Sequence, residues 1–303
     1  GLGNNNKICS KLVHELEFKF VAFSDKGDEM WETCDNRKLT LEPLEQNEVR
    51  VVALDQSFYA LCDEKVAGTL IPVFSLRSEG SFGVGDFGDL KLMVDWMAKT
   101  HQRLLQVLPI NDSTSTHTWT DSYPYSCISI FALHPQYADL RQLPALKDKL
   151  EADRFEVLRE ELNALPQIDY ERVNNAKLKY LRLLFEQEGK KVLASKEFKT
   201  FFADCERWLA PYAHYCYLRD FYGTCVFSEW PDHKQWNEAD RKALSNPKSE
   251  LYNKVAFYYY MQFVLDQQMR SAHEYARARG VILKGDIPIG VNRNGCDVWP
   301  EPE

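Results

Sequence analysis

The sequence lacks a long apolar run. No stretch approaches the roughly 20 apolar residues that a membrane-spanning helix needs, and residues 1–11 contain no apolar signal core. We therefore expect no membrane partner and predict a cytoplasmic location. A surplus of positive charge is also missing, because 37 Lys and Arg stand against 45 Asp and Glu and give a net charge of −8. Such a chain repels a phosphate backbone, so nucleic acid is not expected as a partner.

Paired metal-ligand motifs are absent too. The eight cysteines are scattered with no C-x-x-C pair, and no histidine stands at zinc-ligand spacing. His117, His134 and His214 are each isolated in the sequence and are interpreted as structural, so we predict no metal and no cofactor. An even cysteine count permits disulfides, but a chain of this length needs no such crosslinks, which favours free and mostly buried thiols.

Two common catalytic fingerprints are missing. Gly83-Val84-Gly85-Asp86 does not continue as the G-x-G-x-x-G that binds dinucleotides. Ser122 has no G-x-S-x-G frame around it, and no His and Asp are ordered for a nucleophilic triad. Nucleotide binding and serine hydrolase chemistry are therefore disfavoured.

Aromatic residues are plentiful. Phe, Trp and Tyr make up 13% of the 303 residues, and several Trp and Tyr lie in polar surroundings. Such rings serve either as core filler or as stacking faces for sugars, and composition does not separate the two. The chain is otherwise that of a globular protein with room for roughly two domains.

The N-terminal part is patterned as β structure. Residues 15–23 alternate apolar and polar side chains, and a turn at 25–28 precedes Met30-Trp31-Glu32, which predicts a β-hairpin. A hairpin alone is not stable, so it must belong to a larger β domain or pack on the rest of the chain. Residues 46–67 are interpreted as a linker that includes a short docking strand at 49–54.

From Gly68 the pattern changes to alternating strands and helices. Apolar runs predict buried parallel strands near 69–75, 104–110 and 281–286, with a helix at 86–100 between the first two. Helical periodicity fills most of 135–250, where Asp169 is a helix cap, and a further helix covers 251–279. This order predicts a β/α barrel interrupted by a helical insertion. Three strands leave much of a barrel wall open.

The polar loop at 119–126 is the strongest candidate for a binding site. It follows a strand, where parallel α/β folds bind ligands, and it combines Asp121, Ser122 and Tyr125 with further rings. This mixture fits either hydrogen bonding to sugar hydroxyls or a structural turn. Asp286, at the end of the third strand, is the second candidate.

Several motifs in sequence order resemble those of glycoside hydrolase family 77, the amylomaltases or disproportionating enzymes. They are Ile71-Pro72-Val73-Phe74-Ser75-Leu76-Arg77-Ser78, Gly83-Val84-Gly85-Asp86, Leu108-Pro109-Ile110-Asn111, Asp121-Ser122-Tyr123-Pro124-Tyr125-Ser126, Lys284-Gly285-Asp286-Ile287-Pro288-Ile289-Gly290-Val291 and Asp297-Val298-Trp299. The resemblance implies that residues 68–303 are the N-terminal part of a (β/α)8 TIM barrel. It also implies a donor-side substrate-binding site in which Tyr125 and Asp286 contact the sugar near the cleavage point, accompanied by Asp121 and Ser122.

The N-terminal segment is similar to the closing strands of a family 20 starch-binding domain. Phe18-Lys19-Phe20, Trp31-Glu32 and Asn36-Arg37 carry this similarity. It implies that residues 1–45 are the C-terminal part of a starch-binding β-sandwich, with Lys19, Trp31 and Asn36 at its glucan site. The combination resembles the plant cytosolic branch of the family.

The family implies a 4-α-glucanotransferase, which moves α-1,4-glucan segments between maltodextrins, glycogen or starch by a retaining double displacement. In the family the two catalytic carboxylates come after the Asp297-Val298-Trp299 motif. We therefore expect them beyond Glu303 and expect residues 1–303 alone to be inactive. The alternative is a non-catalytic glucan-binding protein.

Overall fold

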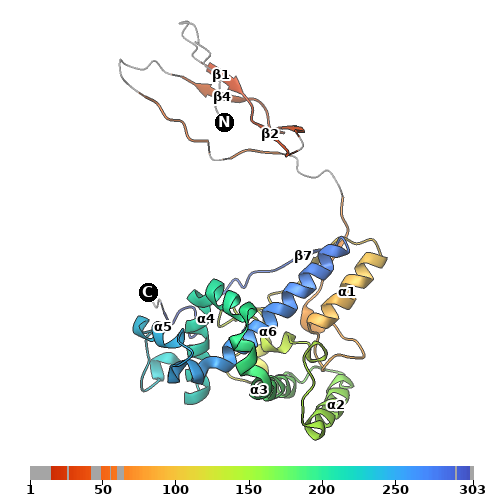
Figure 1. The fold of residues 1–303 in the computed structure, drawn as a ribbon. Coiled ribbons are helices and arrows are strands. Elements are labelled where there is room, and N and C mark those ends of the chain that lie inside the picture. The colour runs from red at the N-terminus through yellow and green to blue at the C-terminus, as the bar shows by residue number, and fades with distance from the viewer. Residues whose placement is uncertain are drawn as a thin grey trace. The chain divides into compact units, whose positions relative to one another are not determined.

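The computed structural model describes residues 15–25, 27–41, 49–54, 56–59, 65–290 and 292–300. The chain divides into two compact units, Gly1–Lys65 and Val66–Glu303, drawn in Figure 1. The regular structure described in the first unit is all β, whereas the second unit is mostly helical.

The first unit contains two small antiparallel ladders. Strand β1 (Glu15–Phe18) pairs with β4 (Arg37–Thr40), and β2 (Val21–Phe23) pairs with β3 (Glu29–Trp31). The β2–β3 pair confirms the predicted hairpin. The docking strand predicted at 49–54 is wrong, because these residues form no strand. Val49 and Val51 are each 86% exposed, so nothing packs against them.

A charged side chain is buried in the described part of this first unit. Glu32 is the only buried residue among those described in 15–65. Its carboxylate accepts hydrogen bonds from Phe20 N–H and Phe58 N–H, both at 3.1 Å, and forms a 2.6 Å ion pair with Arg37. The described part of the unit is therefore held by a polar cluster rather than by an apolar core.

The second unit is built on a three-stranded parallel sheet. Its strands β5 (Gly68–Leu70), β6 (Leu104–Gln106) and β7 (Ile282–Lys284) lie in that order, with Thr69 opposite Leu105 and Leu105 opposite Leu283. The three predicted parallel strands are confirmed at shorter lengths. The expected continuation of the first strand to residue 75 is wrong, because residues 73–75 form a 3₁₀ turn, η1 (Val73–Ser75). Pro72 has no N–H to extend a ladder, and its carbonyl accepts from Ser75 N and Oγ instead.

Helices cover one face of this sheet and form most of the unit. The α-helices are α1 (Phe87–Lys99), α2 (Lys149–Asn163), α3 (Tyr170–Ala194), α4 (Lys196–Tyr222), α5 (Glu238–Leu244) and α6 (Glu250–Ala278). Short 3₁₀ segments are η2 (Trp119–Ser122), η3 (Pro135–Tyr137), η4 (Leu140–Gln142) and η5 (Phe227–Glu229). The helices predicted at 86–100 and 251–279 are confirmed as α1 and α6. Asp169 caps α3 as expected, since its side chain accepts from Arg172 N.

Helix α6 is the central element of the hydrophobic core. It packs against α1, α3, α4 and α5, and it runs alongside α1 and β7 in Figure 1. Leu105 in the middle strand is fully buried beneath these helices, whereas Leu70 and Ile282 on the flanking strands are 57% and 59% exposed. Side chains alternate between the two faces of a strand. One face of the sheet is therefore covered and the other is open to solvent.

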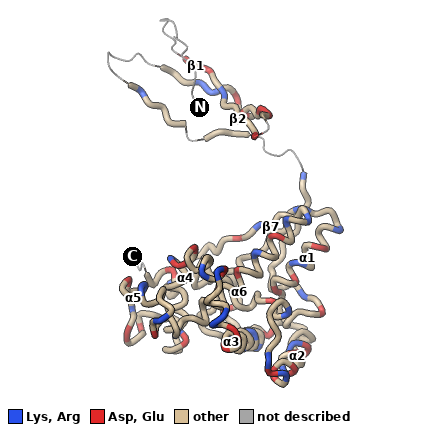
Figure 2. The backbone as a smooth tube through the Cα atoms, in the orientation of Figure 1, with Lys and Arg blue, Asp and Glu red and all other residues tan. Residues whose placement is uncertain are grey.

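Charged side chains, cysteines and helix composition in the described residues are those of a globular protein. Figure 2 shows acidic and basic residues interspersed along α2 and α3, where Glu151 pairs with both Arg154 and Lys179. Six cysteines in the described ranges are free thiols, as predicted, but only three of them are buried, where most were expected to be. Among the described helices, none is both long enough and apolar enough to cross a membrane.

Candidate functional site

A buried carboxylate, that of Asp112, fixes the start of the loop that follows β6. Asp112 is fully buried and accepts hydrogen bonds from Thr114 N (2.9 Å) and Thr114 Oγ1 (2.8 Å). The hydroxyl of Tyr212 in α4 donates to the other oxygen of Asp112 at 2.6 Å. Because both oxygens are used, the start of the loop is tied to the helical core.

A buried arginine continues this support. Arg219 of α4 donates to the carbonyl and hydroxyl oxygens of Thr114 and pairs with Asp220 at 2.7 Å. Asp220 also contacts His117 Nε2 at 2.9 Å and accepts from Tyr258 of α6 at 2.6 Å. Burial alone raises the pKa of Asp220, but Arg219 and the bonds from His117 and Tyr258 hold it well below its usual range. Sequence analysis missed this network, because Arg219 and Asp220 stand in an ordinary helical pattern.

Asp121 lies inside the loop and supports its shape. Its carboxylate is 4% exposed and accepts from Thr116 N and Thr116 Oγ1, both at about 3.0 Å, and from His117 N at 2.7 Å. Ser113 donates its hydroxyl hydrogen to the carbonyl of Asp121 at 2.6 Å. Ser122 follows in η2 and is partly buried. Both residues are therefore part of the folded loop, and the contacts of Asp121 are internal to it.

Tyr125 and Asp286 are brought together from distant parts of the sequence. Tyr125 Oη donates to Asp286 Oδ2 at 2.7 Å, and Asp286 lies just after β7. The hydrogen bond to this carboxylate raises the pKa of the Tyr125 phenol, since ionisation would place two negative charges in contact. The loop after β6 and the segment after β7 thus meet at the C-terminal ends of the strands.

An exposed aromatic ring lies beside this pair. The rings of Tyr123 and Tyr125 lie 5.7 Å apart between centroids, and Tyr123 is 61% exposed. Trp119, in the same loop, is 66% exposed. The Asp286 carboxylate, the Tyr125 phenol and the open ring face of Tyr123 are thus brought together by the fold. This combination can hydrogen-bond a sugar hydroxyl while stacking on a ring face.

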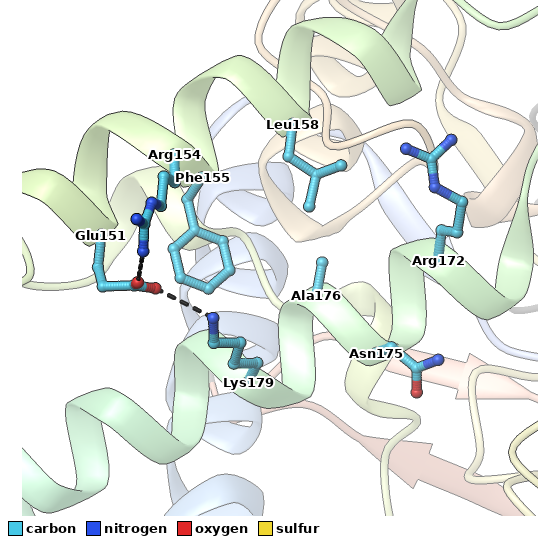
Figure 3. A pocket seen from close by; sticks show the side chains of 8 residues that line it. All are labelled: Glu151, Arg154, Phe155, Leu158, Arg172, Asn175, Ala176 and Lys179. Carbon is cyan, nitrogen blue, oxygen red and sulfur yellow. Dashed lines mark hydrogen bonds and ion pairs between the residues drawn. The ribbon is translucent and has the colours of Figure 1, made fainter.

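The cavity next to the Tyr125–Asp286 pair is smaller than a groove elsewhere in the second unit. A crevice of about 120 Å³ at the strand ends includes Asp286 and Leu108 among its walls, which is less than the roughly 300 Å³ of an ordinary ligand pocket. A larger groove of about 310 Å³ lies between α2 and α3, with Phe155 at its floor and the Glu151–Lys179 ion pair at its rim (Figure 3). None of the predicted site residues lines that groove.

The residues predicted for the N-terminal glucan site lie on or beside the β2–β3 hairpin. Trp31 in β3 is 57% exposed, and Asn36 is exposed before β4. Lys19, between β1 and β2, donates from Nζ to the carbonyl oxygen of Glu32 at 3.4 Å. The structure thus places Lys19 next to Glu32, which directly follows Trp31.

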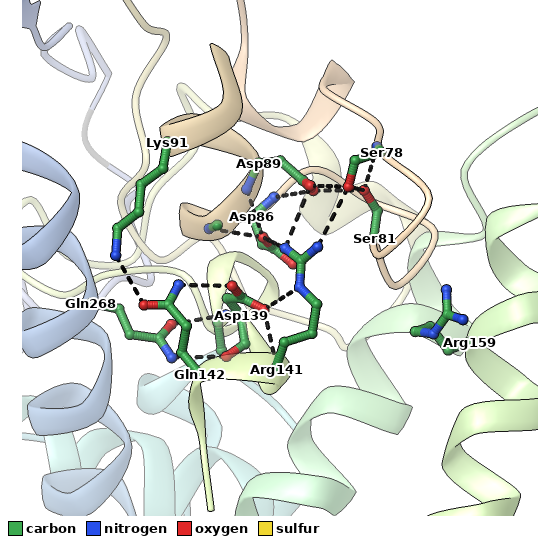
Figure 4. A network of polar contacts seen from close by, with 12 residues as sticks. Ser78, Ser81, Asp86, Asp89, Lys91, Asp139, Arg141, Gln142, Arg159 and Gln268 are labelled. Atoms are coloured by element: carbon green, nitrogen blue, oxygen red, sulfur yellow. Dashed lines mark hydrogen bonds and ion pairs between the residues drawn. The ribbon is translucent and has the colours of Figure 1, made fainter. Parts of the chain in front are cut away.

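The Gly83–Asp86 motif has a structural role. Gly83 has a φ of 78°, and a side chain on Gly85 would collide with the backbone of residues 73 and 76. Asp86 caps α1 and accepts from Arg141 Nη2 at 3.0 Å, within the polar network of Figure 4. Lys177 of α3 is fully buried, 3.6 Å from the Asp86 carboxylate. The glycines therefore permit close packing of this loop against η1 and α2, and the aspartate joins α1 to α3.

One histidine that is isolated in the sequence has potential ligand residues beside it in the fold. His214 in α4 lies with His233 and Asp240, and ligand atoms of the three are all within 4.8 Å of one another. Burial, with a smaller contribution from His233, lowers the pKa of His214 to about 3. These residues come from different elements, so their spacing in the sequence gives no metal-binding signature. His117 and His134 do have structural partners, namely Asp220 and the backbone of Gln136.

The family model described as 4-alpha-glucanotransferase, that of glycoside hydrolase family 77, matches residues 71–303. The chain belongs to this family. The resemblance inferred from the motifs is thereby confirmed.

Relatives of this family 77 chain include plant and bacterial proteins. The 4-alpha-glucanotransferase DPE2 of Oryza sativa subsp. japonica is 37% identical over 98% of this chain and 31% of its own length. That of Chlamydia caviae is 32% identical over 77% of this chain and 42% of its own length. The chain thus spans about a third to two fifths of these relatives. The likeness to the plant protein extends over the residues that precede the family match.

Solved structures show the same fold. The amylomaltase of Streptococcus agalactiae in complex with acarbose has a TM-score of 0.62 at 20% identity and covers 79% of this chain and 46% of that one. The amylomaltase of Corynebacterium glutamicum has a TM-score of 0.61 at 18% identity and covers 94% and 44%. The family 77 chain therefore has an amylomaltase-like fold of mixed helix and sheet.

Proposed function

We propose that this chain forms the donor-sugar side of a 4-α-glucanotransferase acting on maltodextrins, glycogen or starch. The observation that carries the proposal is the Tyr125–Asp286 hydrogen bond at the C-terminal ends of parallel strands, beside the exposed ring of Tyr123. Barrel enzymes place their active sites at this end of the strands. The proposal is supported by the family and by the names of its relatives.

In the proposed reaction, one carboxylate attacks the anomeric carbon and a second protonates the leaving oxygen, after which an acceptor hydroxyl replaces water. Tyr125 and Asp286 would hold the donor sugar near the cleavage point, and Asp121 and Ser122 would shape the loop that presents Tyr125. On the family pattern the nucleophile and the acid/base group come after the Asp297-Val298-Trp299 motif. The proposal therefore assigns no catalytic carboxylate to residues 1–303.

The proposed architecture is a (β/α)8 barrel of which β5, β6 and β7 are the first three strands, with a helical insertion at about 135–250. The open face of the sheet supports it, because Leu70 and Ile282 are apolar and exposed there. Facing side chains of further strands would fill that space in a closed barrel.

We further propose that residues 1–45 are the closing part of a starch-binding β domain, with a linker after it at 46–67. Trp31 supports this assignment by presenting an open ring near Lys19, with Asn36 exposed before the next strand. The proposed location is the cytoplasm, where thiols such as the six described ones stay reduced.

The test measures binding and turnover separately. Calorimetry with maltoheptaose and with acarbose should show binding to the 303-residue chain, and Trp119→Ala should weaken it about 2- to 10-fold through lost stacking. Trp96→Ala, which removes a half-exposed ring from α1, is the matched control and should leave binding unchanged. Equal affinity of Trp119→Ala and the unaltered chain for these glucans would contradict the proposed binding site.

Turnover distinguishes the enzyme from its alternative, a non-catalytic glucan-binding protein. Incubated with maltotriose, residues 1–303 should release no glucose, whereas a longer chain that continues past Glu303 into the catalytic carboxylates should form glucose and longer oligomers. An inert longer chain that still binds glucan would favour the alternative. Turnover by residues 1–303, abolished by Asp286→Asn, would contradict the assignment of the catalytic groups.

A further inference from the structure

Three potential metal ligands from three positions of the second unit converge near its C-terminal segment. His214 lies in α4, His233 precedes α5, and Asp240 lies in the first turn of α5. One ligand atom of each lies within 4.8 Å of the others, and His233 Nδ1 is 3.8 Å from Asp240 Oδ2. In a tetrahedral zinc site, ligand atoms each about 2 Å from the metal are about 3.3 Å apart. Small side-chain rotations therefore suffice to reach coordination geometry.

Three polar atoms of this cluster make no hydrogen bond among the described residues. Both ring nitrogens of His214 and Oδ2 of Asp240 are buried without a hydrogen bond. His214 is 1% exposed as a whole. Buried polar groups in native proteins almost always have a partner, so each exception requires an explanation. A cation would satisfy one nitrogen of His214 and the carboxylate oxygen together.

The surroundings hold the ligands in place. Trp299 Nε1 donates to the backbone carbonyl of His233 at 2.9 Å, and His233 has a left-handed backbone with a φ of 61°. The ring of His214 meets those of Trp299 and Trp236 edge-on, with centroids 5.5 Å and 6.1 Å away. An aromatic wall of this kind limits access of water to a metal and strengthens its bonds to charged ligands.

The rings of His233 and His214 lie 5.2 Å apart between centroids, so the loop before α5 brings His233 next to α4. The hydrogen bond from Trp299 to the His233 carbonyl secures this position.

We propose that His214, His233 and Asp240 form a zinc-binding site with water as the fourth ligand. Two imidazoles and one carboxylate are a zinc-type donor set, and calcium or magnesium would require more oxygen ligands. The bound ion would join α4 to the segment before α5 and, through His233, to Trp299. Its role is therefore to stabilise the arrangement around the Asp297-Val298-Trp299 motif.

Metal binding to the whole 303-residue chain tests the proposal. The chain is freed of metal with EDTA, the chelator is removed, and zinc chloride is titrated by calorimetry. We expect one zinc ion per chain, with affinity lowered at least about tenfold in His233→Gln and in Asp240→Asn. These partly exposed positions are preferred to His214, whose replacement could unfold α4. Circular dichroism confirms that the variants are folded.

A matched control and a spectroscopic probe separate this site from other ligands. His101 also has a left-handed backbone, with a φ of 58°, but lies outside the cluster, so His101→Gln should bind zinc as the unaltered chain does. Cobalt(II) in place of zinc should give the visible bands of a tetrahedral site without a thiolate charge-transfer band, and His233→Gln should remove them. A thiolate band, unchanged zinc affinity in both site variants, or no zinc uptake would each overturn the proposal.

Discussion

Tyr125 Oη lies 2.7 Å from Asp286 Oδ2, although 161 positions separate the two residues in the chain. The bond joins the loop after β6 to the segment after β7. In the proposed complex each group also faces a sugar hydroxyl, so the pair must be positioned before the glucan arrives. Preorganisation of this kind reduces the entropy lost on binding.

Removal of the phenol hydroxyl should therefore weaken glucan binding without unfolding the chain. We expect Tyr125→Phe and Asp286→Asn each to lower the affinity for maltoheptaose about 3- to 10-fold, within the usual range for the net contribution of one hydrogen bond. Calorimetry measures the affinity, and thermal unfolding checks stability. Tyr123→Phe, at an exposed ring of the same loop, is the control. A loss confined to stability would assign the Tyr125–Asp286 bond a purely structural role.

The buried lysine of α3 gives a second prediction. Lys177 donates from Nζ to the carbonyl oxygens of Gln136 at 2.6 Å and Ala138 at 2.8 Å, and it is 3.6 Å from the carboxylate of Asp86. Lys177→Met would leave all three without this partner, so the free energy of unfolding should fall by about 3–5 kcal/mol. Urea unfolding followed by circular dichroism measures the change.

Lys179 on the same helix is the natural control. Its side chain is 61% exposed, and its ion pair with Glu151 lies at the surface. Lys179→Met should change the free energy of unfolding by no more than about 1 kcal/mol. Equal effects of the two substitutions would show that the carbonyl and carboxylate contacts of Lys177 contribute nothing specific.

Gly85 supplies a third prediction, based on space rather than charge. A Cβ there would lie 1.9 Å from the carbonyl oxygen of Val73 and 2.7 Å from that of Leu76, both backbone atoms that cannot rotate away. Gly85→Ala should therefore lower the free energy of unfolding by at least about 2 kcal/mol. Gly285→Ala, where no atom lies within 4 Å of the added carbon, should cost less than about 1 kcal/mol. If Gly85→Ala is tolerated equally well, the close approach does not matter for stability.

The first unit should respond to acid through Glu32. Hydrogen bonds from Arg37, together with those from Phe20 N–H and Phe58 N–H, lower the pKa of Glu32 to about 2 despite its burial. Because this folded-state value is below the ordinary 4.5, the stabilisation is complete above about pH 4.5 and is lost as the pH falls towards 2. The ¹⁹F signal of fluorotryptophan at Trp31, assigned with Trp31→Phe, reports the transition.

Glu32→Gln keeps the shape of the side chain and removes its charge. We expect the Trp31 signal of this variant to lose its dependence on pH between 4.5 and 2. A transition that is the same in the variant would assign the acid response to another group.

Local patterns predicted individual elements well. The apolar runs at 69–75, 104–110 and 281–286 indicated the three parallel strands, and Asp169 is a helix cap as predicted. The strand was expected to continue past Pro72 because the next side chains are apolar, but the missing N–H of Pro72 decided the backbone there. The extended docking strand at 49–54 failed because hydrophobicity alone does not provide a partner strand.

The site was predictable only in part, because some of its contacts join residues that are far apart in the sequence. Tyr125 and Asp286 could be named because each comes after a strand, and parallel strands end at one edge. The support from Arg219 and Asp220 and the cluster around His214 depend on how α4 packs against loops far away in the sequence. Such pairings are set by tertiary packing, and no local spacing encodes them.

The strand order β5–β6–β7 determines when the sheet can be completed during folding. Strands β5 and β6 are joined through α1 alone and can pair early, whereas β7 reaches β6 only after residues 107–281 have been folded. Closing so long a loop costs more conformational entropy than the few hydrogen bonds between β6 and β7 can offset. Helices α2–α6 must therefore form first and shorten the distance between the two strands. We therefore expect β7 to dock last, which makes the meeting of Tyr125 and Asp286 one of the latest events in folding.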